Sequence, residues 1–332
     1  MSALPSHTSP QSAALLGLAV GDALGVPVEF QSRAARRLDP VVHMRAFGTH
    51  NQPAGTWSDD ASLTFCLAES LCRGYNLEDI AQRFIWWYDQ AYWTPHGHVF
   101  DVGVATAEAI RRLREGTSPQ AAGGTTEYDN GNGSLMRILP LLFAVQHLPV
   151  EERFKRVREV SSITHAHARS VLACFIYLET ARELAAGRAK HEAYAHMQQT
   201  VNTFLSATGI VSEAERNRFH RILENPYGAY DIRPLSTYQR AEISSSGYVL
   251  HTLEAALWCL LRYESYAETV LAAVNLGDDT DTTGAVTGGL AGLCYGLADV
   301  PADWLSVLAR RADIEDLAYR LATAQQADAS CG

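Results

Sequence analysis

Two stretches of the sequence carry glycine at every fourth position. The first stripe is Gly17, Gly21 and Gly25, and the second is Gly284, Gly288, Gly292 and Gly296. Residues four apart lie on one face of an α-helix, so each stripe leaves a flat helix face without side chains. Each glycine costs about 1 kcal/mol in helix propensity, which a close backbone contact can offset. The stripes therefore predict two central helices that pack unusually closely.

Glycine stripes also occur where membrane helices dimerise. The second stretch, 281–297, is too short to span a bilayer and is flanked by Asp281 and Asp299. The first apolar stretch, from Ala13 to Val28, is interrupted by Asp22, and no basic segment precedes it. We therefore expect neither a signal peptide nor a membrane anchor, and no membrane partner.

The composition is that of a globular protein with a sizeable core. The chain has 332 residues, of which 47% are hydrophobic and 19% are charged. A formal net charge of -10 argues against nucleic acid as a partner, because phosphate binding needs a basic surface. The six cysteines are scattered and form no CxxC pair, which favours buried thiols over zinc or disulfides. The expected setting is a reducing cytoplasm.

Helical periodicity dominates the sequence after residue 10, and few stretches alternate with a period of two. We expect an all-α protein of about thirteen helices, in which residues 11–328 form a single domain and residues 1–10 a disordered arm. The expected helices cover 11–25, 59–74, 78–91, 100–115, 133–146, 150–162, 166–187, 190–207, 212–223, 247–262, 266–274, 281–297 and 302–325, the last with a break near Arg311. Long loops are expected at 31–58, 116–132 and 224–246.

The strongest chemical signal is a pair of acidic clusters, each at the start of an expected helix. The first reads Gly55-Thr56-Trp57-Ser58-Asp59-Asp60, and the second reads Gly277-Asp278-Asp279-Thr280-Asp281-Thr282-Thr283-Gly284. Each cluster combines carboxylates with a neighbouring hydroxyl, which is the oxygen-rich ligand set of hard divalent cations. The spacing is not that of an EF-hand. The clusters therefore indicate a divalent cation site of another kind.

Helix capping is the alternative explanation for these clusters. Ser, Thr and Asp at a helix N-terminus accept hydrogen bonds from backbone N–H groups and interact favourably with the helix dipole. Capping would explain either cluster alone. The two together favour a cation site, because several close carboxylates repel one another unless a cation neutralises them.

Two further carboxylates stand in short motifs. Glu29 follows Pro27 in an expected loop, where a solvated glutamate is the ordinary explanation. Asp101, in the sequence FDVG, precedes an expected helix and could be its N-cap. Neither residue indicates chemistry by itself.

Three polar motifs also precede or interrupt helices. The segment 130–137 (NGNGSLMR) has a glycine-rich backbone that could cradle phosphate or form a plain turn. His165 and His167 are two residues apart and do not share a helix face, which argues against a zinc pair. Tyr248 could stack on a base or belong to the core.

Taken in order, these motifs resemble those of the ADP-ribosylglycohydrolase family. That family includes the dinitrogenase reductase-activating glycohydrolase and enzymes that release ADP-ribose from arginine or serine. The resemblance runs from about residue 13 to residue 298. Its landmarks are GDALG with Pro27 and Glu29 at 21–29, WSDD at 57–60, FD and Gly at 100–103, GNGS and MR at 131–137, TH at 164–165, SGYV at 246–249 and GDDTDTTGA at 277–285. Seven landmarks in one order are far more specific than any single one.

The resemblance implies a compact orthogonal helical bundle around a binuclear Mg²⁺ or Mn²⁺ centre. Carried over by motif, the metal ligands would be Ser58, Asp59, Asp60, Asp279, Asp281 and Thr282. Glu29 matches a glutamate of the loop that covers the ribose, and Asp101 matches an aspartate near the metals, so these two are the candidate catalytic residues. The candidate substrate contacts are Gly131, Asn132, Gly133, Ser134, His165 and Tyr248.

A reaction follows from the same resemblance. The two ions would anchor the 2- and 3-hydroxyls of the distal ribose and lower the pKa of a bound water. Asp101 or Glu29 would deprotonate that water or protonate the leaving group. Attack at the anomeric carbon would pass through an oxocarbenium-like state. The sequence does not decide which carboxylate is the base and which is the acid.

Three functions fit the sequence. The first is hydrolysis of ADP-ribose from a modified protein side chain, with arginine favoured because an acidic pocket suits a cationic leaving group. The second is hydrolysis of an O-linked or small-molecule ADP-ribose conjugate. The third is a binding role, such as an immunity-type protein that blocks an ADP-ribosylating toxin (an ADP-ribosyltransferase). Retention of all six metal-ligand positions argues against a relative that has lost catalysis.

Overall fold

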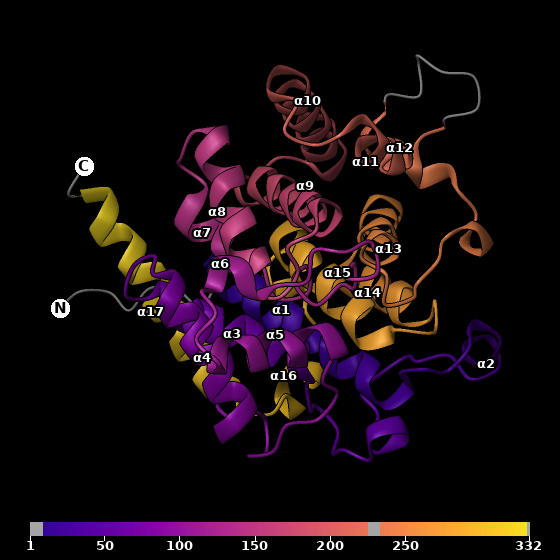
Figure 1. Cartoon of the computed structure of the whole chain (residues 1–332). Helices are drawn as coiled ribbons and strands as arrows, with labels where there is room; N and C mark the ends of the chain where they lie inside the picture. Colours follow the sequence, from indigo (N-terminus) through magenta and orange to yellow (C-terminus); the bar gives the residue numbers. More distant parts are fainter. Residues whose placement is uncertain (1–8, 225–232, 331–332) are drawn as a thin grey trace.

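The computed structural model describes residues 9–224 and 233–330 of the chain (Figure 1). This part contains seventeen α-helices and five 3₁₀ helices, with three isolated bridges and no β-strand. The expectation of an all-α protein is confirmed. The expected disordered arm falls mainly on residues 1–8, which lie outside the described residues. Ser9 caps the first helix, which begins at Pro10.

The elements follow the chain in a fixed order. They are α1 (Pro10–Gly25), η1 (Val26–Val28), α2 (Arg33–Leu38), η2 (Gly48–His50), α3 (Asp59–Leu71), α4 (Leu77–Gln90), α5 (Val104–Arg114), α6 (Pro119–Ala122), α7 (Leu141–Val145), α8 (Val150–Ser162), α9 (Ala168–Ala185), α10 (Lys190–Thr208), α11 (Glu213–Arg218), α12 (His220–Leu223), η3 (Leu235–Thr237), η4 (Arg240–Glu242), α13 (Val249–Arg262), α14 (Tyr266–Val274), α15 (Thr280–Tyr295), η5 (Leu297–Asp299), α16 (Ala302–Val307) and α17 (Arg311–Ser330).

The helix count exceeds the thirteen expected for two reasons. The short helices α2 and α6 lie in segments predicted to be loops, and the expected helices 212–223 and 302–325 are each divided in two. The predicted break near Arg311 is confirmed, because α17 begins there. The predicted helix 133–146 is wrong over its first part, which forms turns up to Pro140. Pro140 has no N–H group and disfavours the helical conformation of the preceding residue, so only Leu141–Val145 is helical.

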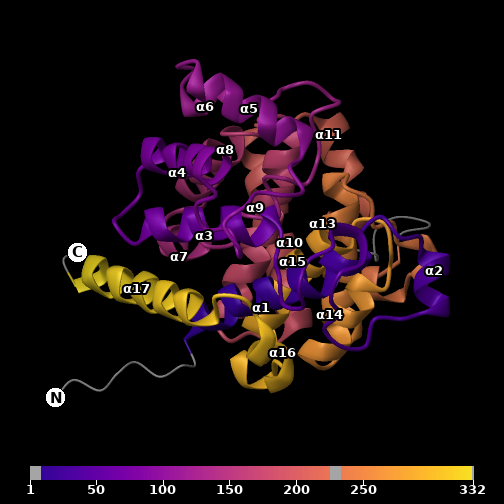
Figure 2. The ribbon, with the colours of Figure 1, turned by 90° about the horizontal axis from the view of Figure 1, so that it is seen from below.

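Helices α1 and α15 lie side by side at the centre of the molecule (Figures 1 and 2). A Cβ atom built on Gly21 would lie 2.1 Å from the carbonyl oxygen of Gly284, and one on Gly288 would lie 2.3 Å from that of Gly17. No side chain tolerates such distances from backbone atoms, so glycine is required on both helices. The close packing predicted from the glycine stripes is confirmed. Gly296 does not take part, because it ends α15 with φ +79 and nothing near it.

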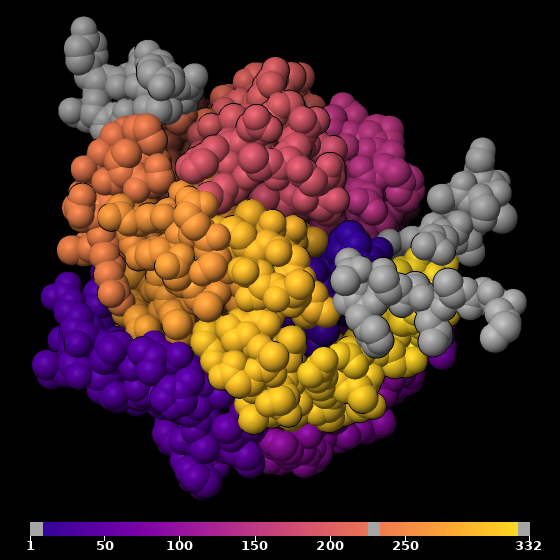
Figure 3. Space-filling view, turned by 180° about the vertical axis from the view of Figure 1, so that it is seen from behind, coloured from indigo at the N-terminus to yellow at the C-terminus, as the bar shows by residue number. Residues whose placement is uncertain are grey.

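The other helices enclose this central pair. Helices α13, α14 and α9 pack around α15, and α3 and α17 pack against α1. The segment Pro10–Val28 is long and apolar enough to cross a membrane, but 94% of its most apolar window is buried inside the molecule, as in a core helix. In the view from behind, the yellow C-terminal segment occupies the middle of the visible face, beside small dark-blue patches of the N-terminal part of the chain (Figure 3).

The antiparallel pairing of the central helices determines where the acidic clusters lie. Gly17 faces Gly288, Gly21 faces Gly284, and Gly25 lies against Asp281. The first turn of α15 therefore adjoins the last turn of α1. The second acidic cluster and the loop that carries Glu29 are brought together by this arrangement.

Candidate metal centre and active site

The second acidic cluster is fixed directly to the end of α1. The Thr280 hydroxyl donates a 2.8 Å hydrogen bond to the carbonyl oxygen of Gly25. A Cβ atom on Gly25 would lie 2.3 Å from the Cα atom of Asp281, so the two backbones are in contact. This contact places Asp279, Asp281 and Thr282 at the end of α1.

The first acidic cluster is held by Asp22, a fully buried residue of the same helix. One Asp22 carboxylate oxygen accepts a 2.9 Å hydrogen bond from the backbone N–H of Ser58, and the other accepts a 3.0 Å bond from that of Ala61. Asp22 belongs to the GDALG motif, but the sequence alone did not predict a role for it in the site. The available signal was a lone carboxylate in an otherwise apolar helix. Helix α1 therefore positions both clusters.

The two clusters meet in space. The Thr282 hydroxyl donates a 3.3 Å hydrogen bond to Oδ1 of Asp60. Three groups of side chains have potential ligand atoms within 4.8 Å of one another: Asp22, Asp60 and Asp281; Glu29, Asp279 and Asp281; and Glu29, His50 and Asp101. Asp281 and Glu29 each belong to two groups, which joins the three into one continuous site.

Several carboxylate oxygens in this site are buried without a partner. Asp60 Oδ2, Asp279 Oδ1 and Asp281 Oδ2 have no hydrogen bond to any described atom. Capping does not account for them: Ser58 caps α3, but Asp279 stands at the N-cap position of α15 and makes no capping bond. Burying polar atoms without partners is costly, and a bound cation would satisfy them. These residues can therefore hold a metal ion.

The pKa values of the clustered carboxyl groups also support a bound cation. Burial, reinforced by neighbouring carboxylates, raises the pKa values of Asp59, Asp60 and Asp281 well above their usual range. Without a counter-ion these carboxyl groups resist ionising together. A divalent cation would stabilise their ionised forms.

A cavity of about 340 Å³ opens beside the cluster. The candidate residues that line it are Glu29, Asp59, Asp60, Asp101, Gly131, Asn132, Gly133, His165, Asp279 and Thr282. Ser58, Asp281, Ser134 and Tyr248 do not line it. The Ser134 hydroxyl is fully buried, where it accepts a 3.0 Å hydrogen bond from Ser161, so its side chain faces the core.

Glu29 lines this cavity and is held there by the η2 segment. His50 Nε2 forms a hydrogen bond with Oε2 of Glu29, and the Thr49 hydroxyl donates a 2.7 Å bond to the Glu29 carbonyl oxygen. Burial raises the pKa of Glu29 to about 7 and also raises the pKa of Asp101. Its hydrogen bond to Glu29 raises the pKa of His50. Sequence reasoning missed His50, which lies in a loop without any pattern.

The glycine-rich segment also lines the cavity, through Gly131, Asn132 and Gly133. Asn132 Nδ2 donates a 2.8 Å hydrogen bond to Asp279 Oδ2 and so orients a candidate metal ligand. A Cβ atom on Gly133 would lie 2.7 Å from the His165 ring, so glycine leaves room for that ring. Burial lowers the pKa of His165 to about 3, which keeps the imidazole neutral. Tyr248 contributes through its backbone, which bridges to Gly131.

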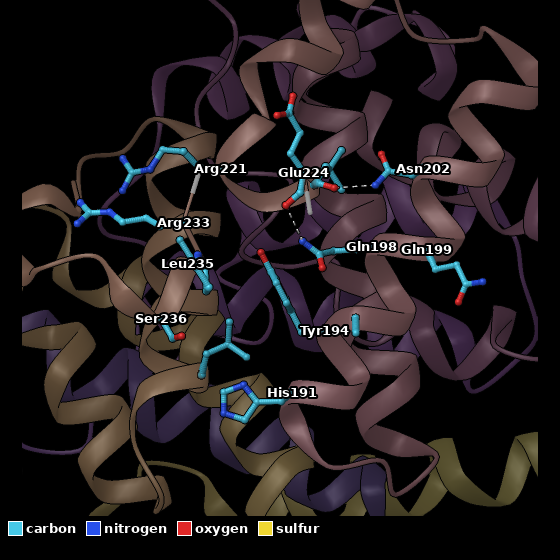
Figure 4. Close-up of a pocket in the computed structure, with 14 residues that line it drawn as sticks. His191, Tyr194, Gln198, Gln199, Asn202, Arg221, Glu224, Arg233, Leu235 and Ser236 are labelled. Carbon is cyan, nitrogen blue, oxygen red and sulfur yellow. Dashed lines mark hydrogen bonds between the residues drawn. The ribbon is translucent and has the colours of Figure 1, made fainter. Parts of the chain in front are cut away.

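A second cavity, of about 490 Å³, lies between α10 and residues of the ranges 221–224 and 233–236 (Figure 4). Three polar side chains along α10 face it: Tyr194, Gln198 and Asn202. They donate hydrogen bonds of 2.6 to 2.8 Å to the backbone carbonyls of Ile222 and Leu223. Because these donors are already used to hold the chain, we place the candidate active site in the acidic cavity.

Comparison with known proteins identifies the family of the chain. The sequence signature of the ADP-ribosylglycohydrolase family matches residues 11–331, so the chain belongs to this family of glycosyl hydrolases. The ADP-ribosylarginine hydrolase Tri1 of Pseudomonas putida (strain GB-1) is 32% identical over 311 residues, which are 93% of this chain and 76% of that protein. The ADP-ribosyl-[dinitrogen reductase] glycohydrolase of Rhodospirillum rubrum is 29% identical over 316 residues, or 94% of each chain.

A solved structure extends the similarity to the fold. The structure described as an ADP-ribosylglycohydrolase-related protein complex has a TM-score of 0.74 and 32% sequence identity. The match covers 96% of this chain and 98% of the other. The chain is therefore an ADP-ribosylglycohydrolase family enzyme with a helical fold.

Proposed function

We propose that this enzyme hydrolyses the N-glycosidic bond between ADP-ribose and an arginine side chain of a modified protein, and that it requires two Mg²⁺ or Mn²⁺ ions. The observation that carries the proposal is the set of buried, unpartnered oxygens of Asp60, Asp279 and Asp281 beside an open acidic cavity. Such an enzyme reverses ADP-ribosylation. Two relatives support this choice of substrate: the name of one contains ADP-ribosylarginine, and the name of the other contains an ADP-ribosylated protein, dinitrogen reductase.

The proposed metal ligands come from the first turns of α3 and α15. They are Ser58, Asp59, Asp60, Asp279, Asp281 and Thr282. Carboxylate and hydroxyl oxygens are the donors that Mg²⁺ and Mn²⁺ prefer. When bound, such ions supply positive charge that holds the ribose hydroxyls and activates the attacking water. Asp22 holds the first turn of α3 through two backbone N–H groups, and Asn132 orients Asp279, so both residues position the proposed ligands.

The reaction breaks the bond between the anomeric carbon and a guanidine nitrogen, and it adds water. The carbon receives a hydroxyl group, and the nitrogen receives a proton. Glu29 and Asp101 line the cavity, and burial raises the pKa of Glu29 to about 7 and also raises that of Asp101, so these two carboxyl groups are the candidates for the proton transfer. His50 holds the Glu29 carboxyl group in place from outside the cavity. The carboxylates also favour positive charge on the sugar as the bond breaks.

The charge of the cavity and the state of the cysteines support the proposed substrate and the proposed cellular location. The cavity lining contains five carboxylates and no lysine or arginine, which suits a guanidinium leaving group. We place the protein in the cytoplasm, a setting that suits the five described cysteines, all of which are free thiols.

The test is release of ADP-ribose from an arginine-ADP-ribosylated protein in the presence of Mg²⁺ or Mn²⁺. The test variant is Asp281→Asn, and the matched control is Asp278→Asn, which changes an exposed aspartate three residues away. Asparagine accepts the positive φ of 62 at position 278, so the control should fold normally. We expect EDTA and Asp281→Asn to abolish release, while Asp278→Asn leaves it unchanged.

Two outcomes would contradict the proposal. Release that persists in EDTA would exclude the metal requirement. Absence of release by a wild-type protein that binds Mn²⁺ and ADP-ribose would exclude the arginine linkage. In that case O-linked and small-molecule conjugates, and then toxin binding, are the next substrates and partners to measure.

A further inference from the structure

Five rings form a continuous row on the surface beside the candidate active site. The ring row consists of Phe30, His50, Phe100, His98 and His96, and the successive centroids are 6.1, 5.2, 6.2 and 6.4 Å apart. It begins at Phe30, which lines the acidic cavity and is 67% exposed. It ends at His98 and His96, which are both exposed. The row therefore leads from the mouth of the cavity onto the open surface.

Each imidazole of the row is held in place by a residue of the segment 29–56. Glu29 binds His50, Gln52 lies 3.3 Å from His98 Nε2, and the hydroxyl of the buried Thr56 lies 2.8 Å from His96 Nε2. Fixing an exposed side chain costs conformational entropy, and at His98 and His96 little burial offsets that cost. The two outer rings are thus preorganised without a role in the core.

The chemistry of the row identifies its occupant as a basic segment. Ring faces attract guanidinium groups, and arginine stacks on such faces. Burial lowers the pKa of His96, which favours the neutral form of this ring and so reduces its repulsion of a cation. The row starts at a cavity lined by carboxylates, on a protein with a net charge of -10. Charge complementarity therefore favours a cationic partner over an acidic one.

We propose that the ring row is a docking surface for a basic segment that flanks the modified arginine in the protein substrate. This inference rests on the proposed function and adds to it the sequence context of the target. Phe30 and His50 receive the residues next to the modified side chain, and His98 and His96 receive arginine side chains farther along the target chain. The surface selects a protein substrate over a free ADP-ribosyl compound.

The test compares three substrates with the full-length enzyme and Mg²⁺. They are a short peptide with one ADP-ribosylarginine flanked by arginines, the same peptide flanked by glutamates, and free ADP-ribosylarginine. The variant is His96→Ala/His98→Ala, and the matched control is His147→Ala, an exposed histidine outside the row. Each exposed ring contributes roughly two- to fivefold in affinity for a cation, so the double variant should lower kcat/KM on the arginine-flanked peptide about tenfold.

The other measurements separate the possible explanations. We expect the double variant to act normally on free ADP-ribosylarginine, because neither histidine lines the cavity. We expect a His96→Phe/His98→Phe variant, which keeps both ring faces, to retain the preference for the arginine-flanked peptide. An equal loss on all three substrates, no loss on any, or a wild-type preference for the glutamate-flanked peptide would overturn the docking surface. Failure of the wild-type enzyme on all three substrates would instead refute the proposed function.

Discussion

Adjacent glycines of α15 provide a direct test of the close packing between the central helices. Gly288→Ala places a methyl group 2.3 Å from the backbone oxygen of Gly17, whereas Gly289→Ala places one 2.5 Å from the end of the Leu139 side chain and 2.9 Å from the Tyr177 hydroxyl. Both substitutions occur in the interior of the same helix. Each gains about 1 kcal/mol of helix propensity, so this gain cancels in the comparison.

The difference in stability follows from what each methyl group meets. A backbone oxygen cannot move aside, so Gly288→Ala must separate α1 from α15 by about 1 Å and loses contacts along the whole interface. Overpacking costs typically about 1–3 kcal/mol and occasionally more, and for a contact with backbone atoms we take about 3–5 kcal/mol. Subtracting the propensity gain of about 1 kcal/mol leaves Gly288→Ala destabilised by about 2–4 kcal/mol. The side chains beside Gly289 can shift, and that variant should stay within about 1 kcal/mol of the wild type.

Thermal unfolding in EDTA measures this difference. An unfolding entropy of about 2.1 cal/mol/K per residue means that 1 kcal/mol changes the Tm of a chain of 332 residues by about 1.4 °C. We therefore expect Gly288→Ala to lower the Tm by about 3–6 °C and Gly289→Ala to change it by less than about 2 °C. Equal effects of the two substitutions would refute the argument that backbone contact determines the requirement for glycine.

Three other predictions concern the site. Alanine at Asp22 removes the acceptor for two buried N–H groups, so Asp22→Ala should lower the free energy of unfolding by about 2–5 kcal/mol, and Asp22→Asn, which keeps one oxygen, should lower it by less. Urea denaturation measures both values, and equal values for the two variants would contradict the prediction. Burial raises the pKa values of Asp22 and Glu29 to about 7 from 3.8 and 4.5, so the stability contributed by their protonated forms is complete below about pH 4 and lost as the pH rises to about 7 in the metal-free protein. A bound cation favours the ionised forms, so the rise in Tm caused by Mg²⁺ should be larger at about pH 7.5 than at about pH 5. At a hundredfold excess of Mg²⁺ over Kd, binding stabilises the protein by about 2.7 kcal/mol. An equal rise in Tm at both pH values would contradict the prediction. The Arg137 guanidinium holds the glycine-rich segment by donating hydrogen bonds to the carbonyl oxygens of Gly133 and Val160. Arg137→Lys should therefore raise KM for the ADP-ribosylated substrate several-fold, with a smaller change in kcat. An unchanged KM in steady-state kinetics would contradict this role.

The sequence predicted the features that repeat or cluster along the chain. The glycine stripes indicated the central helix pair because a period of four has a direct structural meaning, and the acidic clusters indicated a cation site because carboxylates rarely gather without one. The helix 133–146 was predicted wrongly, because its apolar residues fit helical periodicity while Pro140 and the contacts of Arg137 favour turns.

Contacts made by irregular loops could not be predicted in this way. His50 reaches Glu29 only because the loop folds back, with the backbone of Gly48 against the carbonyl oxygen of Pro27. No pattern in the segment 31–58 encodes that return. Ser134 shows the same limit: its motif suggested a substrate contact, but a motif does not reveal that the hydroxyl faces Ser161 in the core.

The pairing of α1 with α15 also determines when the enzyme can become active after synthesis. Gly17 and Gly288 touch although they are far apart in the sequence, and the two acidic clusters come from segments near opposite ends of the chain. Such non-local contacts slow folding, because a long loop must close before the contact forms. A nascent chain on the ribosome carries α1 with an apolar, unpaired glycine face until α15 has emerged. The site can therefore be complete only after α15 has emerged, and a truncated chain that lacks α15 does not have the central interface.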